Sequence, residues 1–305
     1  MRIGFHVPTE GGWLKALWRA RERRCEALQV FASAPVQWAR RESDPAEVAA
    51  FAEGCRRYDI APVFVHGAYL LNLASPDAAL RARSAATLAA DLRLSLALGA
   101  VGMVVHLGSI GGDERRGARR EGLRRVARTI DAALASAPAG PQVVLENAAG
   151  AGGTLGGTYG EVAAVLAASR DADRLAVCLD TAHSFAAGYA WHTPEGLQAA
   201  LDEAEREFGL GRVCLIHAND SRSAFGSHVD RHWHIGRGQI GRAGFRCILA
   251  EPRLRHLPFV METPEASLER DLHNLRALRR CLPPEVRRPV RRAPRQPRRR
   301  TERQS

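Results

Sequence analysis

The chain has 305 residues, of which 46% are hydrophobic and 25% are charged. This composition is typical of a folded globular protein and excludes a collagen-like or wholly disordered chain. The N-terminus lacks a basic segment followed by an apolar one, and no apolar run is long enough to span a bilayer. We therefore expect a cytoplasmic protein that makes no membrane contact.

The net charge of +11 is unevenly distributed along the chain. Residues 283–305 contain nine arginines and two glutamates, a net +7, which leaves +4 for the rest. That segment is rich in Pro and Arg and poor in apolar residues, so we predict a folded domain at 1–282 and a disordered basic tail at 283–305. The tail would fit either a solubilising role or a nonspecific DNA tether. The mildly basic body permits a polyanionic partner without demanding one.

A short apolar run recurs eight times, each time followed by a polar loop and a longer helical segment. Continuous rather than alternating apolar runs are typical of strands that are covered on both faces of a parallel sheet. The predicted strands are residues 2–7, 28–31, 62–66, 103–106, 142–146, 175–180, 212–217 and 258–262.

Several of the intervening helices begin with a capping residue close to a proline, and two are closed by a glycine. The predicted starts are Ser43-Asp44-Pro45, Ser75-Pro76-Asp77, Thr193-Pro194-Glu195 and Thr263-Pro264-Glu265, and the closing glycines are Gly99 and Gly209. Eight β-then-α units in one chain predict an α/β protein with a TIM (β/α)8 barrel. A doubly wound sheet is the alternative.

Potential metal ligands end six successive predicted strands: His66, His106, Glu146, Asp180, His217 and Glu262. His183 follows three residues after Asp180, and a later loop places Asp230 and His232 two residues apart. Any one of them alone would more often be a loop or helix-capping residue. Their recurrence at the face where TIM-barrel active sites are built predicts that they converge on one mouth. So many carboxylates would repel one another without a cation, and imidazole combined with carboxylate suits zinc best, with manganese or iron as alternatives.

The chain resembles the endonuclease IV family of apurinic/apyrimidinic (AP) endonucleases, which are xylose-isomerase-like TIM barrels. The resemblance runs from His6 to Glu262 and excludes the tail. It rests on the strings HGAYLLNL at 66–73, HLGS at 106–109, LENAAG at 145–150, CLDTAH at 178–183, HANDS at 217–221, VDRH at 229–232 and MET at 261–263. Several of these strings are distinctive by themselves, and they occur in the order of the family.

The resemblance implies a trinuclear zinc site at the C-terminal ends of the strands, with manganese possible at one position. It assigns His66, His106 and Glu146 to one ion. Glu146 would bridge to a second ion, which Asp180, His217 and Glu262 complete. The third ion would be held by His183, Asp230 and His232.

The resemblance also implies the reaction. Metal-activated water would attack the phosphorus 5′ to an abasic sugar in duplex DNA, with Glu146 bridging two ions and Glu262 orienting the nucleophile. The products would be a 3′-hydroxyl and a 5′-deoxyribose phosphate, and the family also trims blocked 3′ ends. We expect a DNA-repair enzyme that works as a monomer and associates with the nucleoid through its substrate.

Two further positions concern the grip on DNA. Tyr69 and Leu70 match residues that enter the DNA at the lesion in this family, and an apolar wedge suits a step that has already lost a base. Val36 stands where the family usually has a DNA-probing arginine. We expect this replacement to affect affinity rather than metal chemistry, and the Arg-rich tail is a candidate for compensating phosphate contacts.

Two other functions compete with this interpretation. A sugar isomerase or epimerase of the wider barrel class would need about four ligands, and Glu146, Asp180, His217 and Glu262 could serve in that way. It would not need the five remaining ligand candidates. A DNA-binding protein without catalysis would rely on the tail, and the complete ligand set argues against it.

Overall fold

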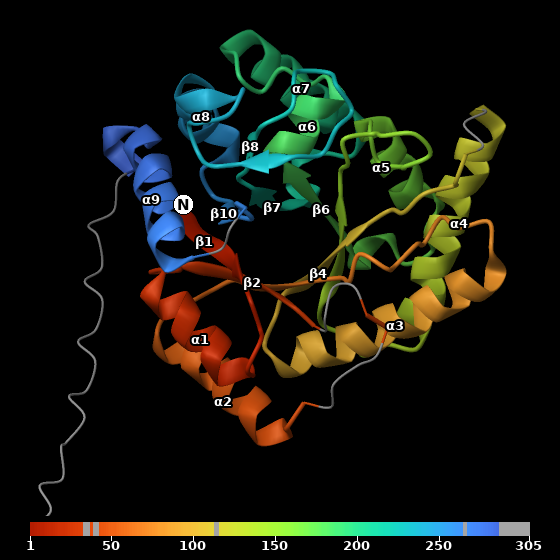
Figure 1. Cartoon of the computed structure of the whole chain (residues 1–305). Helices are drawn as coiled ribbons and strands as arrows, with labels where there is room; N and C mark the ends of the chain where they lie inside the picture. Colours follow the sequence, from red (N-terminus) through yellow and green to blue (C-terminus); the bar gives the residue numbers. More distant parts are fainter. Residues whose placement is uncertain (33–36, 39–42, 113–115, 265–266, 287–305) are drawn as a thin grey trace, which may run out of the picture.

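The computed structural model describes residues 1–32, 37–38, 43–112, 116–264 and 267–286. Eight parallel strands close into a barrel in the order β1-β10-β7-β6-β5-β4-β3-β2, with helices around the outside (Figure 1). The barrel strands are β1 (Arg2–Val7), β2 (Ala27–Phe31), β3 (Val63–His66), β4 (Gly102–His106), β5 (Gln142–Glu146), β6 (Leu175–Asp180), β7 (Val213–His217) and β10 (Pro258–Met261). The predicted TIM barrel is therefore confirmed, and the doubly wound alternative is wrong.

Most of the helices lie between consecutive barrel strands. They are α1 (Trp13–Glu22), α2 (Pro45–Arg57), α3 (Ala78–Ala97), α4 (Arg116–Ala135), α5 (Tyr159–Ala168), α6 (Thr181–Ala187), α7 (Pro194–Glu207), α8 (Gly241–Ala250) and α9 (Leu268–Cys281). Within the described ranges there are four short 3-10 helices, η1 (Ala172–Arg174), η2 (Leu210–Arg212), η3 (Pro252–Leu254) and η4 (Pro284–Val286). No helix among the described residues is long and apolar enough to cross a membrane.

Two of the predicted helix starts need correction. The helix α3 is capped by Asp77, whose carboxylate accepts from the Ala79 amide at 2.8 Å, and not by Ser75. The helix α9 is capped by Ser267, so Thr263 lies outside it. The starts at Thr193 and near Asp44 are confirmed.

The strands carry apolar side chains toward both faces, which explains their continuous apolar runs. Inside the barrel a cluster of buried side chains fills the centre, including Phe64, Val104, Val144 and Leu215. The outward-pointing side chains form a second and larger core with the helices. Packing on both faces fixes the strand ends relative to one another, and these ends carry the site.

A two-stranded hairpin, β8 (Asp220–Ser221) and β9 (His232–Trp233), follows β7 and was not predicted. The Asp220 carboxylate holds the next turn, because it accepts from the amides of Gly236, Gly238 and Ile240 at 2.8, 2.9 and 3.0 Å. The hairpin is thereby fixed above the C-terminal ends of the barrel strands.

Candidate metal centre

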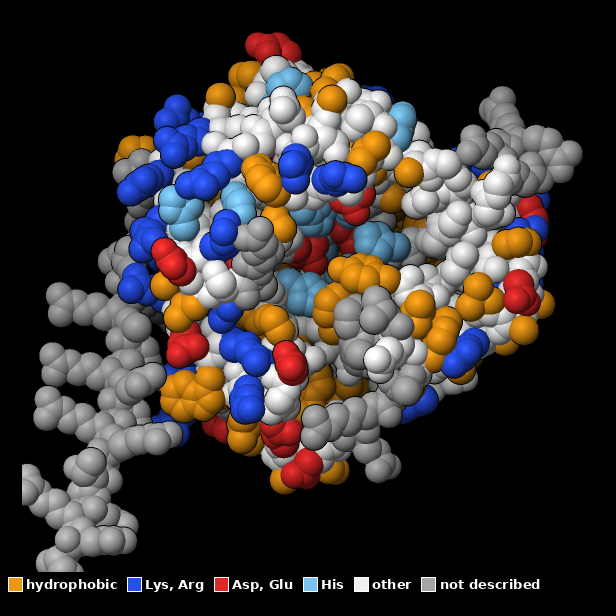
Figure 2. All heavy atoms as spheres, in the orientation of Figure 1, with side chains coloured by type: hydrophobic (Ala, Val, Ile, Leu, Met, Phe, Trp, Pro, Cys, Tyr) orange, Lys and Arg blue, Asp and Glu red, His pale blue; other side chains and the backbone are white. Residues whose placement is uncertain are grey.

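Side chains from six strand ends meet at the C-terminal mouth of the barrel, where Figure 2 shows a hollow that contains histidine and acidic side chains. The strand register brings them to one level, since His106 pairs with Glu146 and Asp180 pairs with His217. The predicted convergence of the strand ends is confirmed.

The side chains form three groups in which one donor atom per residue lies within 4.8 Å of the others. Two donors of one tetrahedral zinc ion are roughly 3.4 Å apart, so small side-chain movements would close each group around an ion. The groups are His66, His106 and Glu146; Glu146, Asp180, His217 and Glu262; and Asp180, His183 and His232. Asp230 lies against the third group, at 3.1 Å from His183 Nε2 and 3.3 Å from His232 Nε2.

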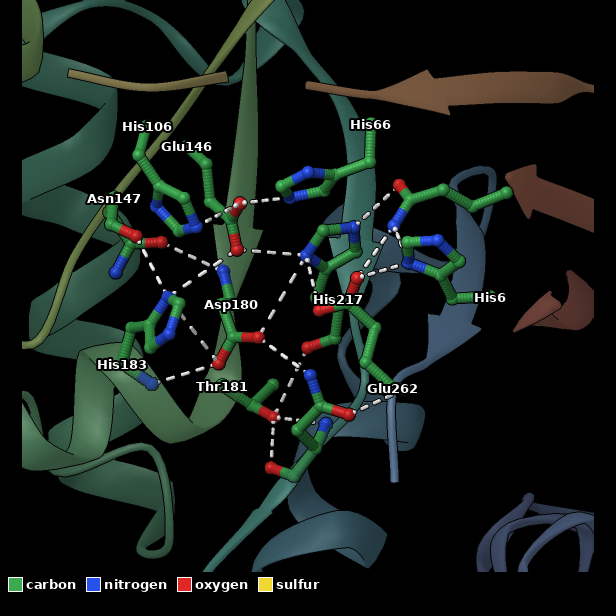
Figure 3. Close-up of polar contacts among 12 residues, drawn as sticks. His6, His66, His106, Glu146, Asn147, Asp180, Thr181, His183, His217 and Glu262 are labelled. Carbon is green, nitrogen blue, oxygen red and sulfur yellow. Dashed lines mark hydrogen bonds and ion pairs between the residues drawn. The ribbon is translucent and has the colours of Figure 1, made fainter. Parts of the chain in front are cut away.

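Glu146 is the centre of the arrangement and is fully buried (Figure 3). One carboxylate oxygen faces His66 Nε2 at 3.2 Å and His106 Nε2 at 3.5 Å, and the other faces His217 Nδ1 at 2.9 Å. Burial alone would raise the pKa of Glu146. The charges of His106 and His217, with hydrogen bonds from His183 and His217, hold it well below its usual range.

Four histidines each use one ring nitrogen to bond an oxygen acceptor and turn the other toward the carboxylates. His66 Nδ1 bonds the Gly67 carbonyl at 2.8 Å, and His183 Nδ1 bonds the Asn147 carbonyl at 2.9 Å. His232 Nδ1 lies 3.3 Å from the Glu262 carbonyl, and His217 Nε2 lies 2.9 Å from the Gln29 side-chain oxygen. Since a carbonyl only accepts, each of these nitrogens carries the proton. This is how metal-binding histidines are usually oriented.

The contact between His183 and His232 is the strongest test of fit to a metal. Their Nε2 atoms lie 3.3 Å apart, and both rings have their Nδ1 proton directed to a carbonyl. Two Nε2 lone pairs that face each other repel unless a proton or a metal ion lies between them, and the Asp230 and Asp180 carboxylates lie beside them. The donor set of imidazoles and carboxylates therefore fits zinc.

Two asparagines fix the carboxylates. Asn219 donates to Asp180 Oδ2 at 2.7 Å and accepts from the Glu262 amide at 2.8 Å. Asn147 accepts from the Asp180 amide at 2.7 Å. Asp180 also caps α6 by accepting from the His183 amide at 2.8 Å, so one short element positions two candidate ligands.

Gln29 and His6 complete the site beside Glu262, and their roles were not predicted. Gln29 is fully buried and donates to Glu262 Oε1 at 2.6 Å, and His6 Nδ1 lies 3.0 Å from the same oxygen. Burial would raise the pKa of Glu262, but the charge of His217 and the hydrogen bond from His6 hold it well below its usual range. A polar residue inside an otherwise apolar strand is the signal that could have identified Gln29.

The rim of the mouth carries the predicted DNA contacts. The Tyr69 side chain is 61% exposed, and its ring packs edge-on against Phe31 with centroids 5.5 Å apart. Leu70 is half-buried. The Asp230 side chain is 55% exposed, which makes it the most open of the candidate ligands. Val36 lies outside the described residues, and so does most of the tail.

Comparisons with known proteins agree with this geometry. A family model for xylose isomerase-like TIM barrels matches residues 19–282. A protein of Solibacter usitatus named "Probable endonuclease 4" is 39% identical over 284 residues, covering 92% of this chain and 96% of that one. One of the same name from Nitratidesulfovibrio vulgaris is 40% identical over 281 residues, with 91% and 98% covered.

Solved structures give the same result. The crystal structure of endonuclease IV from Thermus thermophilus superposes with a TM-score of 0.78 at 37% identity and covers 92% of this chain and 98% of that one. A D-tagatose 3-epimerase-like protein superposes with a TM-score of 0.67 at 19% identity, over 92% and 97% of the two chains. The second likeness shows the shared barrel fold alone.

Proposed function

This chain belongs to the endonuclease IV family of metal-dependent DNA-repair nucleases, and we propose that it hydrolyses the phosphodiester bond immediately 5′ to an abasic site in duplex DNA. The products are a 3′-hydroxyl and a 5′-deoxyribose phosphate. The observation that carries the proposal is the facing pair of His183 and His232 beside Asp230, next to a second donor group around Glu146. A sugar epimerase with one metal ion would have no use for this additional group.

The proposed ligand sets give each donor group one zinc ion, three per chain, with manganese possible at one position. His66, His106 and Glu146 would hold the first, and Glu146, Asp180, His217 and Glu262 the second. His183 and His232 of the third group, with Asp230 beside them, would hold the third. When bound, the ions lower the pKa of a coordinated water and neutralise charge on the phosphate.

Glu262 is the residue that we propose to orient the attacking water. Its Oε1 is occupied by Gln29 and His6, so Oε2, 3.3 Å from His217 Nδ1, is the oxygen that would face the ions. Because the pKa of Glu262 is held low, the group stays ionised and would orient the attacking water by accepting a hydrogen bond from it. Glu146 keeps the first two donor groups at a fixed separation.

Tyr69, together with Leu70, is proposed to occupy the gap in the helix at the abasic step. An aromatic side chain that stands 61% exposed at the rim of a buried polar site is suited to stacking in that gap. Hydrolysis at blocked 3′ ends would use the same residues, since it breaks the same kind of bond and also yields a 3′-hydroxyl.

The test uses a duplex with one tetrahydrofuran abasic analogue, which cannot be cleaved by β-elimination. Zinc-loaded protein should cut 5′ to the analogue and leave an extendable 3′-hydroxyl. Glu262→Gln should lower the single-turnover rate by about 100-fold or more. Glu53→Gln, an exposed charge on α2, is the matched control and should cut at the wild-type rate. If folded, zinc-loaded protein leaves the duplex intact, the proposal is wrong.

Domain organisation and assembly are proposed on the same basis. We infer that residues 1–282 form the catalytic domain and that the protein acts as a monomer. A chain truncated after residue 282 should fold and cut the analogue, and aggregation of this truncated chain would contradict the domain boundary. Sedimentation of the full chain should give the mass of one chain, and a dimeric mass would contradict the monomer. A DNA-tethering role for residues 283–305 would be excluded if their deletion left the salt dependence of binding unchanged.

A further inference from the structure

A cluster of basic side chains covers the outer surface of α8 and α9, beside the mouth of the barrel. We name it the basic wall; its members are Arg237, Arg242, Arg246, His273, Arg276 and Arg280, all of them exposed. Arg242 and Arg246 are four residues apart on α8. The three members on α9 follow at spacings of three and four, which places them on one face of that helix. The two helices pack side by side, so the two rows form one surface.

The positive charge of the basic wall is not neutralised within the described part of the chain. No described carboxylate lies within 4.0 Å of a guanidinium nitrogen of its five arginines. Neighbouring arginines do have acidic partners, as Arg255 pairs with Glu285 at 3.6 Å and Arg279 with Glu26 at 3.5 Å. Partial loss of solvent and the charges of four arginines of the wall lower the pKa of His273. These charges therefore lie close enough to act together.

The basic wall is continuous with the rim of the metal centre. Arg237 lies in the turn that Asp220 holds after β9, the strand that carries His232. On the hairpin itself, the Arg222 guanidinium stacks over the Trp233 ring at 4.7 Å. Helices in this fold run opposite to the strands, so α8 and α9 both begin at the mouth. The wall thus extends from the rim along the outside of the barrel, and Figure 2 shows basic side chains gathered there beside the hollow.

We infer that the basic wall binds the phosphodiester backbone of one arm of the substrate duplex where that arm leaves the metal centre. This inference rests on the proposed function. Residues 273 to 280 cover about 10 Å of helix, at 1.5 Å per residue. A B-form duplex presents one negative charge per ~1.7 Å, or about six over that length. Among the described residues of α8 and α9 the only exposed large apolar side chain is Leu268, at 37%, so a polyanion fits this basic surface better than a protein partner.

The test compares two double variants of the full, zinc-loaded chain. Arg242→Gln with Arg276→Gln removes two charges from the basic wall, and Arg57→Gln with Arg93→Gln removes two exposed charges from α2 and α3. The probe is a centrally abasic duplex of about 30 base pairs, about 100 Å long at 3.4 Å per step. Each lost phosphate contact should make the slope of log affinity against log salt shallower by about 0.9, or about 1.8 for both. Affinity at 0.1 M salt should fall tenfold or more, whereas the control should match the wild type.

A second arm of the experiment tests geometry. Probes are shortened on one side of the lesion to about four base pairs, roughly 14 Å. Shortening the arm that lies on the basic wall should abolish the difference in salt dependence between the wall variant and the wild type. Shortening the other arm should preserve this difference. Equal slopes for the wall variant and the wild type, or an equal loss in the control, would overturn the inference. Failure of the proposed function looks different, because wild-type protein would then leave the abasic probe uncut.

Discussion

Gln29 should control the metal affinity of the centre although it is not proposed as a ligand. Its side-chain oxygen accepts from His217 Nε2 at 2.9 Å, which leaves His217 Nδ1 free to face Glu146 and Glu262. Its amide group donates to Glu262 Oε1 at 2.6 Å. One buried amide therefore sets the tautomer of one candidate ligand and the orientation of another. We predict that Gln29→Met, which keeps the shape but removes both bonds, weakens binding at the second donor group.

The expected loss of zinc affinity follows from the groups that the substitution leaves without a hydrogen-bond partner. Hydrogen bonds to charged groups contribute about 1.5–3 kcal/mol each. His6 still contacts Glu262 Oε1 at 3.0 Å in the variant, so the loss at Glu262 is only partial. Loss of an outer partner of a metal ligand typically weakens metal affinity or activity by about 10–100-fold. We expect a loss within this range.

The assay follows the release of zinc from the loaded protein to a chelator, together with incision of the abasic duplex. Gln29→Met should release one zinc per chain markedly faster than the wild type and should cut more slowly. The matched control is Gln142→Met, the same exchange at the start of β5 and at the opposite end of the barrel. Wild-type release kinetics and wild-type incision in Gln29→Met would refute the reasoning. Equal effects in both variants would point to loss of packing instead.

Two other predictions concern stability. Hydrogen bonds from Arg253 lower the pKa of Glu251 in the folded protein. The ionised carboxylate therefore stabilises the folded state fully above the pKa of an unfolded glutamate, about 4.3. This stabilisation is lost as the pH falls through the lowered pKa of the folded state. Glu251→Gln should therefore reduce the free energy of unfolding at pH 7 by less than about 1 kcal/mol, with the difference vanishing in acid, and a difference independent of pH would contradict this. Asp220→Ala should lower the free energy of unfolding by roughly 2–5 kcal/mol, because the half-buried amides of Gly236 and Gly238 and the buried amide of Ile240 lose their acceptor. Asp220→Asn keeps one oxygen and should lose less. A denaturant midpoint for Asp220→Ala equal to that of the wild type would show that the turn does not depend on this carboxylate.

The barrel could be predicted from the sequence because its strands are buried on both faces. Their apolar runs are continuous, and the observed bounds differ from the predicted ones by at most one residue at either end. Helix starts were harder, since several residues of one turn can act as cap. At residues 75–77 the carboxylate of Asp77 reaches the free amide, whereas Ser75 Oγ bonds the Asp77 amide outside the helix. Local composition does not distinguish these two outcomes.

The site was predictable only in part for a related reason. Ligand candidates at strand ends share a place in the fold, so their convergence follows from the barrel. Gln29 lies in the middle of β2 and not at a strand end, and its partners His217 and Glu262 are 188 and 233 residues away along the chain. The hairpin strands have two residues each, too few for any periodicity to show. Both features depend on tertiary contacts that a sequence pattern does not contain.

Two strand-end histidines, His66 and His106, and the hairpin after β7 together separate this centre from an arrangement of four ligands. Glu146, Asp180, His217 and Glu262 all stand at strand ends, and a sugar-converting barrel could use those four. The hairpin and its loop add His232 and the half-exposed Asp230, and they bring both to His183 on α6. These additions extend the buried donor groups outward to the rim, where a DNA backbone too large to enter the barrel can reach them. The basic wall begins in the next turn of the chain. We therefore propose that the segment between β7 and α8 adapts the centre to a polymeric substrate, while the barrel supplies the rigid support.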